Sequence, residues 1–224
     1  LKDLGQGRTL IVWKDGSQPY VSATLSFLGG DLFLEGGAEG LSQVSAAMLT
    51  SATQSKNYAQ MNEYLLDRAS GLNAAGGLTD FSVTLDAPSR FSNDIFALMN
   101  EVLTSPAFSQ EDLDRVKREQ TAAILSEEES ASGLLRRNLQ PFLFRGSVYG
   151  NKPDGTAESL AAISRDDVLA FWERQKTRPW VLSVVGDISG EEAEAFALTL
   201  PVPSAPAAQL PDAVWNTDKE LEIV

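Results

Sequence analysis

The chain has 224 residues, of which 43% are hydrophobic and 22% charged, as in an ordinary globular protein with one large domain or two small ones. It contains no histidine and no cysteine, which excludes His-dependent triads, thiol nucleophiles, disulfides and thiolate metal sites. The formal net charge of −13 disfavours a nucleic-acid partner, because an acidic surface repels the phosphate backbone. No apolar run of about 18 or more residues predicts a membrane span.

The first quarter of the chain predicts two strands, a loop and a helix. Residues 8–13 are apolar and β-branched, and residues 20–27 alternate between apolar and polar side chains, so both segments are expected to be strands. Residues 31–40 are rich in glycine and are expected to be a loop. In residues 41–49 the apolar side chains recur at helical spacing, which predicts a helix packed on the sheet.

The helix predicted at residues 41–49 has the spacing of a metal-binding helix. Positions 43 and 47 lie one turn apart on the same face, so their side chains could hold one ion. They are Gln43, an amide, and Ala47, a methyl group. The geometry of a metal site is therefore expected here without its ligands, and the alternative is an ordinary amphipathic helix.

The middle of the chain predicts a helix followed by two strands of unequal strength. A helix is expected at residues 57–70, with Ser55 as its N-cap. Residues 71–77 are small and glycine-bearing, which indicates a weak strand that another backbone can approach. Residues 79–85 alternate cleanly and predict a strong strand.

Helices dominate the remainder of the sequence. They are predicted at about residues 90–104, 110–129, 134–144, 168–175 and from 191 onwards. Between them, residues 179–187 form a nearly continuous apolar run, which favours a central strand. Residues 1–200 are expected to form one domain, 201–213 a Pro/Ala-rich linker, and 214–224 the start of a following domain.

Two strings resemble the insulinase/pitrilysin group of zinc metallopeptidases, the inverzincins. Residues 40–48 are similar to the family string G-L-A-H-L-L-E-H-M, in which two histidines bind zinc and the glutamate activates water. Residues 147–160 are similar to the family string H-P-Y-G-x-P-x-x-G-T-x-E-S-L. The three positions of the signature fall on Gln43, Ala46 and Ala47, so the chain resembles the non-catalytic kind of domain in this family, with no catalytic and no metal-ligating residue.

The resemblance also points to a third degenerate position and to a peptide-binding strand. In active relatives a glutamate on the long helix is the third zinc ligand, and the local string makes Glu127 its equivalent; the alternative is a solvated acidic cluster. A strand of the sheet edge receives substrate peptide in those relatives, and Asn73, Ala74 and Ala75 fall there. The alternative for that segment is an edge strand with no ligand.

The fold implied is α+β, an antiparallel-leaning sheet with helices packed mainly on one face, of the LuxS/MPP type. The function expected from the resemblance is a non-catalytic domain or subunit that pairs with a catalytic peptidase half, forms part of the proteolysis chamber and binds extended peptide. Zinc is expected in that catalytic partner and no cofactor in this chain. Two alternatives stay open: a purely structural subunit, and a hydrolase that uses carboxylates alone.

Overall fold

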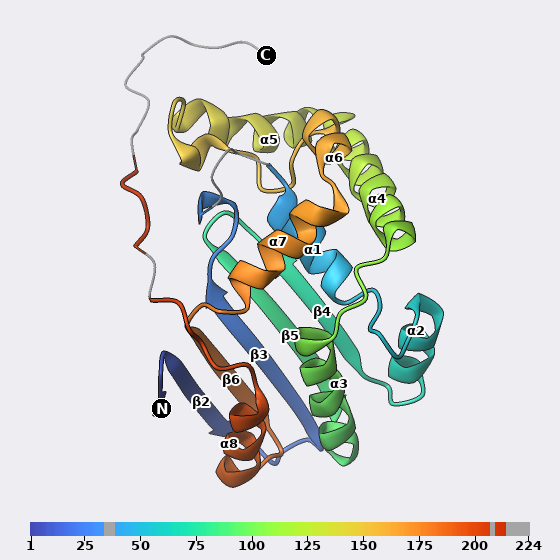
Figure 1. The fold of residues 1–224 in the computed structure, drawn as a ribbon, viewed down its shortest axis with the longest axis vertical. Coiled ribbons are helices and arrows are strands. Elements are labelled where there is room, and N and C mark those ends of the chain that lie inside the picture. Colours follow the sequence, from blue (N-terminus) through green and yellow to red (C-terminus); the bar gives the residue numbers. More distant parts are fainter. Residues whose placement is uncertain (34–38, 207–208, 214–224) are drawn as a thin grey trace.

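A six-stranded mixed sheet lies at the centre of the computed structural model, which describes residues 1–33, 39–206 and 209–213. In sheet order the strands are β1 (Lys2–Gly5), β2 (Arg8–Lys14), β6 (Trp180–Gly186), β3 (Tyr20–Leu28), β5 (Asp80–Pro88) and β4 (Gly71–Gly76). Neighbouring strands pair antiparallel, except that β2 and β6 run parallel. The α+β prediction is confirmed, and the sheet is mixed because β6, after a long helical excursion, enters between β2 and β3 (Figure 1).

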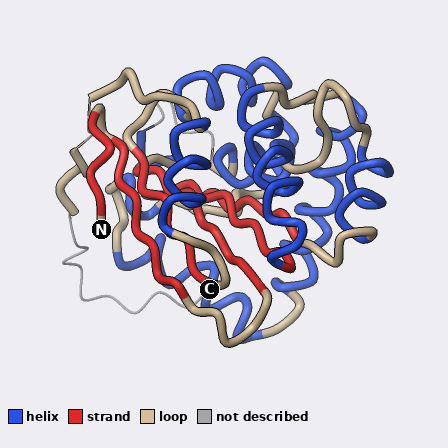
Figure 2. The backbone as a smooth tube through the Cα atoms, turned by 90° about the horizontal axis from the view of Figure 1, so that it is seen from below, coloured by secondary structure: helices blue, strands red, loops and turns tan. Residues whose placement is uncertain are grey.

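The helices pack mainly against one face of this sheet. Figure 1 shows α1, α7 and α8 lying across the strands, and Figure 2 shows the same layering from below. The helices are α1 (Leu41–Leu49), α2 (Tyr58–Leu66), α3 (Ser92–Thr104), α4 (Gln110–Glu128), α5 (Ala131–Leu143), α6 (Ala157–Ala162), α7 (Arg165–Gln175) and α8 (Gly190–Thr199). Within the described ranges, none of them is both long and apolar enough to cross a membrane.

The alternation predicted for β3 and β5 explains how the core forms. Every second side chain of β3, from Val21 to Phe27, is buried towards the helices, while Ser22, Thr24 and Ser26 lie on the other face. Burying such a row on one side fixes the register, because a shift by one residue would turn the apolar row to solvent. The fixed register therefore gives α1 a defined apolar surface of the sheet to pack against.

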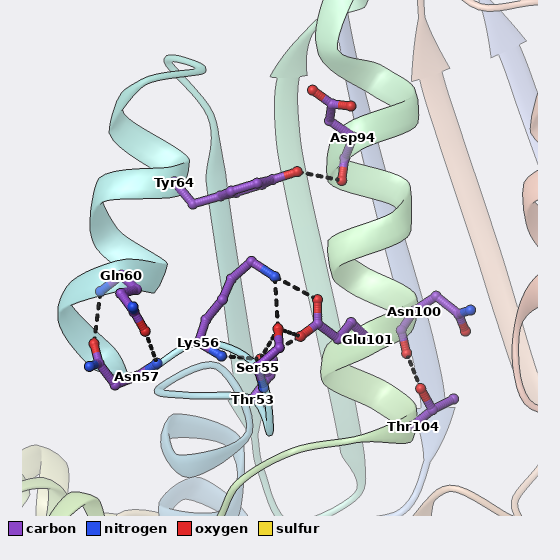
Figure 3. Close-up of polar contacts among 10 residues, drawn as sticks. All are labelled: Thr53, Ser55, Lys56, Asn57, Gln60, Tyr64, Asp94, Asn100, Glu101 and Thr104. Carbon is purple, nitrogen blue, oxygen red and sulfur yellow. Dashed lines mark hydrogen bonds and ion pairs between the residues drawn. The ribbon is translucent and has the colours of Figure 1, made fainter.

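The start of α2 differs from the sequence-based prediction. Asn57, not Ser55, is the N-cap, and it forms a capping box with Gln60. Ser55 is engaged elsewhere, because its hydroxyl and the Lys56 ammonium both donate to the Glu101 carboxylate on α3 (Figure 3). The loop before α2 is thereby fastened to α3.

The two ends of the described chain differ in how well the sequence predicted them. The strand β1 was not predicted from sequence, since its short, polar string has no strand periodicity. The described linker residues, 201–206 and 209–213, contain no helix or strand. Residues 214–224 lie outside the described ranges, so the division into domains stays a prediction.

Candidate functional site

A buried carboxylate fixes the start of α1, the helix that carries the degenerate signature. Asp31 accepts hydrogen bonds from the backbone N–H groups of Gly40 (3.0 Å) and Ser42 (2.8 Å), so it satisfies donors that a helix start leaves unpaired. Burial raises the pKa of Asp31 to about 7, against the opposing effect of these two hydrogen bonds. Gly40 has a φ of 84°, and a Cβ there would lie 3.0 Å from the Gly155 Cα, which explains why glycine precedes the helix.

The signature helix faces α4 across a cavity of about 340 Å³. Gln43 and Ala47 line this cavity from α1, and Glu127 lines it from α4, so the structure brings these three predicted positions together. Ala46 is fully buried in the hydrophobic core and does not line the cavity. The remaining lining residues are Val116, Glu119, Gln120, Ala123, Ile124 and Asp154.

Gln43 uses its side chain to hold the sheet edge. Its Oε1 accepts a hydrogen bond from the backbone N–H of Gly76, the last residue of β4, at 3.1 Å. The two elements are close enough that a Cβ on Gly76 would lie 2.3 Å from the carbonyl oxygen of Ser42. The amide therefore ties α1 to β4 at a position that the resemblance aligns with a zinc ligand.

Glu127 is an ion-pair partner and only partly solvated. Its carboxylate accepts a hydrogen bond from the Nε of Arg136 at 2.7 Å, and its side chain is 19% exposed. The hydrogen bond to Glu127 raises the pKa of Arg136. Among the residues that the structure describes, no group of three or more His, Cys, Asp or Glu side chains is placed to hold a metal ion, whereas catalytic zinc sites use about three protein ligands.

The family-like string at residues 147–160 closes one side of the cavity. The buried guanidinium of Arg137 donates to the Gly155 carbonyl at 2.8 Å and to the Glu128 carboxylate at 3.0 Å. The Gln120 amide donates to the Asp154 carbonyl at 2.7 Å. These contacts clamp the loop between α4 and α5.

The strand β4 lies at one edge of the sheet, as predicted, and carries Asn73, Ala74 and Ala75. The N–H of Gly77 donates to the carbonyl of Asp80 within the β4–β5 turn, whereas the N–H of Gly76 points to Gln43. Backbone groups of alternate residues in an antiparallel strand point to the same side.

The backbone groups of Leu72 and Ala74 therefore face away from β5, like those of Gly76. Neither residue makes a further backbone hydrogen bond within the described ranges. The side chains of Asn73 and Ala75 are exposed on the open face of the sheet, while Leu72 is buried. The edge thus offers backbone donors and acceptors at positions 72 and 74.

Several residues of this site were missed by reasoning from sequence. The sequence contained only a weak signal for Asp31: it is a carboxylate in the loop between a predicted strand and a predicted helix, and it belongs to no recognisable motif. Arg137 gave no signal of burial, because an arginine on a predicted helix is usually exposed. The outward-facing backbone of Leu72 follows only from the pairing register.

Comparisons with known proteins agree with this geometry. No family model matches the chain. It is 26% identical over 168 residues to the non-peptidase homolog YmxG of Helicobacter pylori, an alignment that covers 75% of this chain and 39% of that protein.

Solved structures share the fold. The inactive domain of a peptidase M16 from Pseudomonas fluorescens superposes with a TM-score of 0.82 at 22% identity, over 93% of this chain and 52% of the other. The periplasmic protease PqqL from Escherichia coli gives 0.78 at 19%, over 97% and 25%. The chain thus spans about half the length, or less, of these relatives. The comparisons agree with the resemblance: the chain shares the fold of an inactive peptidase M16 domain and is similar in sequence to a non-peptidase homolog.

Proposed function

We propose that this domain is the non-catalytic half of an insulinase-type zinc metallopeptidase. In this proposal it pairs with a catalytic domain or subunit that holds the zinc, forms one wall of the proteolysis chamber, and binds extended peptide along the free edge of β4. The observation that carries the proposal is the pair of outward-facing backbone positions, Leu72 and Ala74, on the edge strand that Gln43 links to the cavity between α1 and α4.

Peptide addition to β4 has a clear physical basis. An extended peptide can continue the sheet by pairing its own N–H and C=O groups with those of an edge strand. On β4 this pairing is limited at one end, because Gln43 already occupies the N–H of Gly76. A bound peptide would thus pair at Leu72 and Ala74 and place alternate side chains over Asn73 and Ala75.

The same observation favours one alternative, a purely structural subunit without peptide binding. A short open edge with one end closed by Gln43 provides few hydrogen bonds, each contributing about 0.5–1.5 kcal/mol net. In that case the edge would be covered by a partner chain in the assembly, and the isolated domain would bind no peptide.

The variant Ala74→Pro separates these two functions. Proline removes the outward N–H of residue 74 but no hydrogen bond to β5, so the strand is expected to persist. Binding of an unstructured, fluorophore-labelled basic peptide is followed by fluorescence anisotropy. We expect saturable binding by the wild type and about tenfold weaker binding by Ala74→Pro.

Ala74→Val is the matched control, because it changes the same side chain and keeps the N–H. Its affinity should stay within about twofold of the wild type. Absence of binding by the wild-type chain would support the structural subunit. Equal affinities of Ala74→Pro and Ala74→Val for the peptide would show that the peptide binds somewhere other than the β4 edge.

A further inference from the structure

A second cavity lies between helix α7 and the C-terminal end of α3 with the loop that follows it. Its volume is about 240 Å³. The residues that line it from α7 recur at helical spacing and share one face of that helix: Leu169, Trp172, Glu173 and Lys176. Gln54, residues 104–106 and Phe108 form the opposite wall. The cavity shares no residue with the β4 edge or with the lining of the cavity between α1 and α4.

The most deeply buried polar group of the lining is an indole N–H without a partner. Trp172 is 2% exposed, and its Nε1 makes no hydrogen bond to any described residue. Trp180 is buried to the same extent, but its Nε1–H donates to the carbonyl of Pro201 at 2.9 Å. Leaving a buried donor unpaired is costly, and buried indole N–H groups usually find an acceptor. Trp172 therefore brings to the cavity a donor that an occupant can satisfy.

Three backbone carbonyls of the opposite wall already accept hydrogen bonds. The carbonyl of Ser105 accepts from the backbone N–H of Gln54 at 2.9 Å, and that of Pro106 accepts from the Gln54 side-chain amide at 3.3 Å. The carbonyl of Phe108 accepts from the Nε of Arg165 at 2.6 Å. These bonds hold the wall in place and use acceptors that an occupant would otherwise meet.

Lys176 adds a second donor on the α7 side, one turn after Trp172. Its ammonium donates to the Glu173 carboxylate at 2.6 Å, and because an ammonium has three N–H groups, two are left for other acceptors. This ion pair is open to solvent, with side chains that are 31% and 63% exposed, so it competes only weakly with another acceptor. The unused capacity on this helix face thus consists of N–H donors, one of them charged, which suits an anionic acceptor.

We propose that this cavity binds a small organic carboxylate, whose oxygens accept from the Nε1–H of Trp172 and from the ammonium of Lys176. The volume is below the range of about 300–1,000 Å³ that is usual for ligand pockets, so the ligand is small. Its apolar part would lie against Leu169 and Phe108. The proposal goes beyond peptide binding at β4 and does not depend on it.

Titration with propionate, followed through the indole N–H signals of ¹⁵N-labelled protein, tests this binding. The chain has 4 tryptophans, and the variant Trp172→Phe identifies the signal of Trp172. We expect propionate to shift that signal downfield and saturably, with a dissociation constant on the order of 1–10 mM. The signal of Trp180, whose N–H is already bonded, should stay in place. A shift without saturation, or equal shifts of all indole signals, would overturn the proposal.

Charge recognition by Lys176 is tested with a neutral ligand and with a pair of variants. Propionamide has the same size as propionate and no charge, so it should bind about tenfold more weakly. Lys176→Gln should weaken propionate binding about tenfold. Arg174→Gln is the matched control, because it removes the same charge from α7 at a position that does not line the cavity, and its affinity should stay within about twofold. Equal affinities for the two ligands, or equal effects of the two variants, would overturn the proposal.

Discussion

At the scale of single residues, the cavity between α1 and α4 is lined by three positions that the resemblance aligns with zinc ligands. Gln43, Ala47 and Glu127 line the same space, and only Glu127 has a side chain that zinc binds well. Arg136 competes for that carboxylate at 2.7 Å. The lining of this cavity thus offers a single carboxylate from the three positions, too few ligands for a catalytic zinc site.

We predict that histidines at the first two of these positions create a zinc-binding site. In the variant Gln43→His/Ala47→His, two imidazoles and Glu127 supply about three protein ligands, so zinc should bind near stoichiometrically. Elemental analysis after dialysis measures this, with the wild type expected to retain only traces. Adding Glu127→Gln should reduce the bound zinc strongly. Stoichiometric zinc in the wild type would instead support the hydrolase alternative.

Asp31 is expected to make stability depend on pH. Burial raises its pKa from 3.8 to about 7 in the folded state, so between these values the folded chain holds a proton that the unfolded chain releases. The contribution of Asp31 to the free energy of unfolding therefore falls as pH rises from about 4 to 7, by up to about 4 kcal/mol, and is constant above.

Urea unfolding of Asp31→Asn at a series of pH values tests this expectation. The free energy of unfolding of the wild type, relative to that of the variant, should fall as the pH rises from about 4 to 7. Asp67→Asn, at an exposed position at the end of α2, is the control for the general effect of replacing a carboxylate by an amide. A difference in stability between wild type and Asp31→Asn that does not change with pH would contradict the raised pKa.

At the scale of elements, the close contact between α1 and β4 depends on a glycine, Gly76, in the strand. Gly76 lets the strand approach the backbone of Ser42, where a Cβ would lie 2.3 Å from the carbonyl oxygen. This close approach is also what allows Gln43 to reach the N–H of Gly76. The helix and the edge strand are thus positioned by the same residue.

We predict that Gly76→Ala destabilises the domain by about 1–3 kcal/mol, since the backbone of α1 must shift to make room. Gly71→Ala in the same strand is the matched control, because the nearest heavy atom to its Cβ would be 3.9 Å away. Thermal unfolding compares the two. Similar melting temperatures for both variants would show that the backbone of α1 can shift away from residue 76 with little loss of stability.

At the scale of the whole molecule, local patterns predicted the elements well. The alternation of residues 20–27 and the apolar run at 179–187 correspond to β3 and β6, and both are central to the sheet. The helix predicted from residue 110 corresponds to α4, which begins there with Ser109 as its N-cap. These features are visible because each depends on residues only a few positions apart.

Features that depend on distant residues could not be predicted from the sequence. The parallel pairing of β2 with β6 joins strands from opposite ends of the chain. The burial of Arg137 depends on Gly155, and the role of Gln43 depends on Gly76. The site residues Gln43, Ala47 and Glu127 were found through the family resemblance, because an amide, a methyl group and a lone carboxylate carry no metal-site signal of their own.

The position of β6 predicts where the chain can be shortened. This last strand pairs with both β2 and β3, and it buries Trp180, Leu182 and Val184. A chain ending after Lys176 should therefore fail to fold, because the sheet would split between β2 and β3. A chain ending after Ala213 keeps all six strands and should retain a cooperative thermal transition. Circular dichroism distinguishes these outcomes, and cooperative unfolding of the shorter chain would mean that β6 is dispensable to the core.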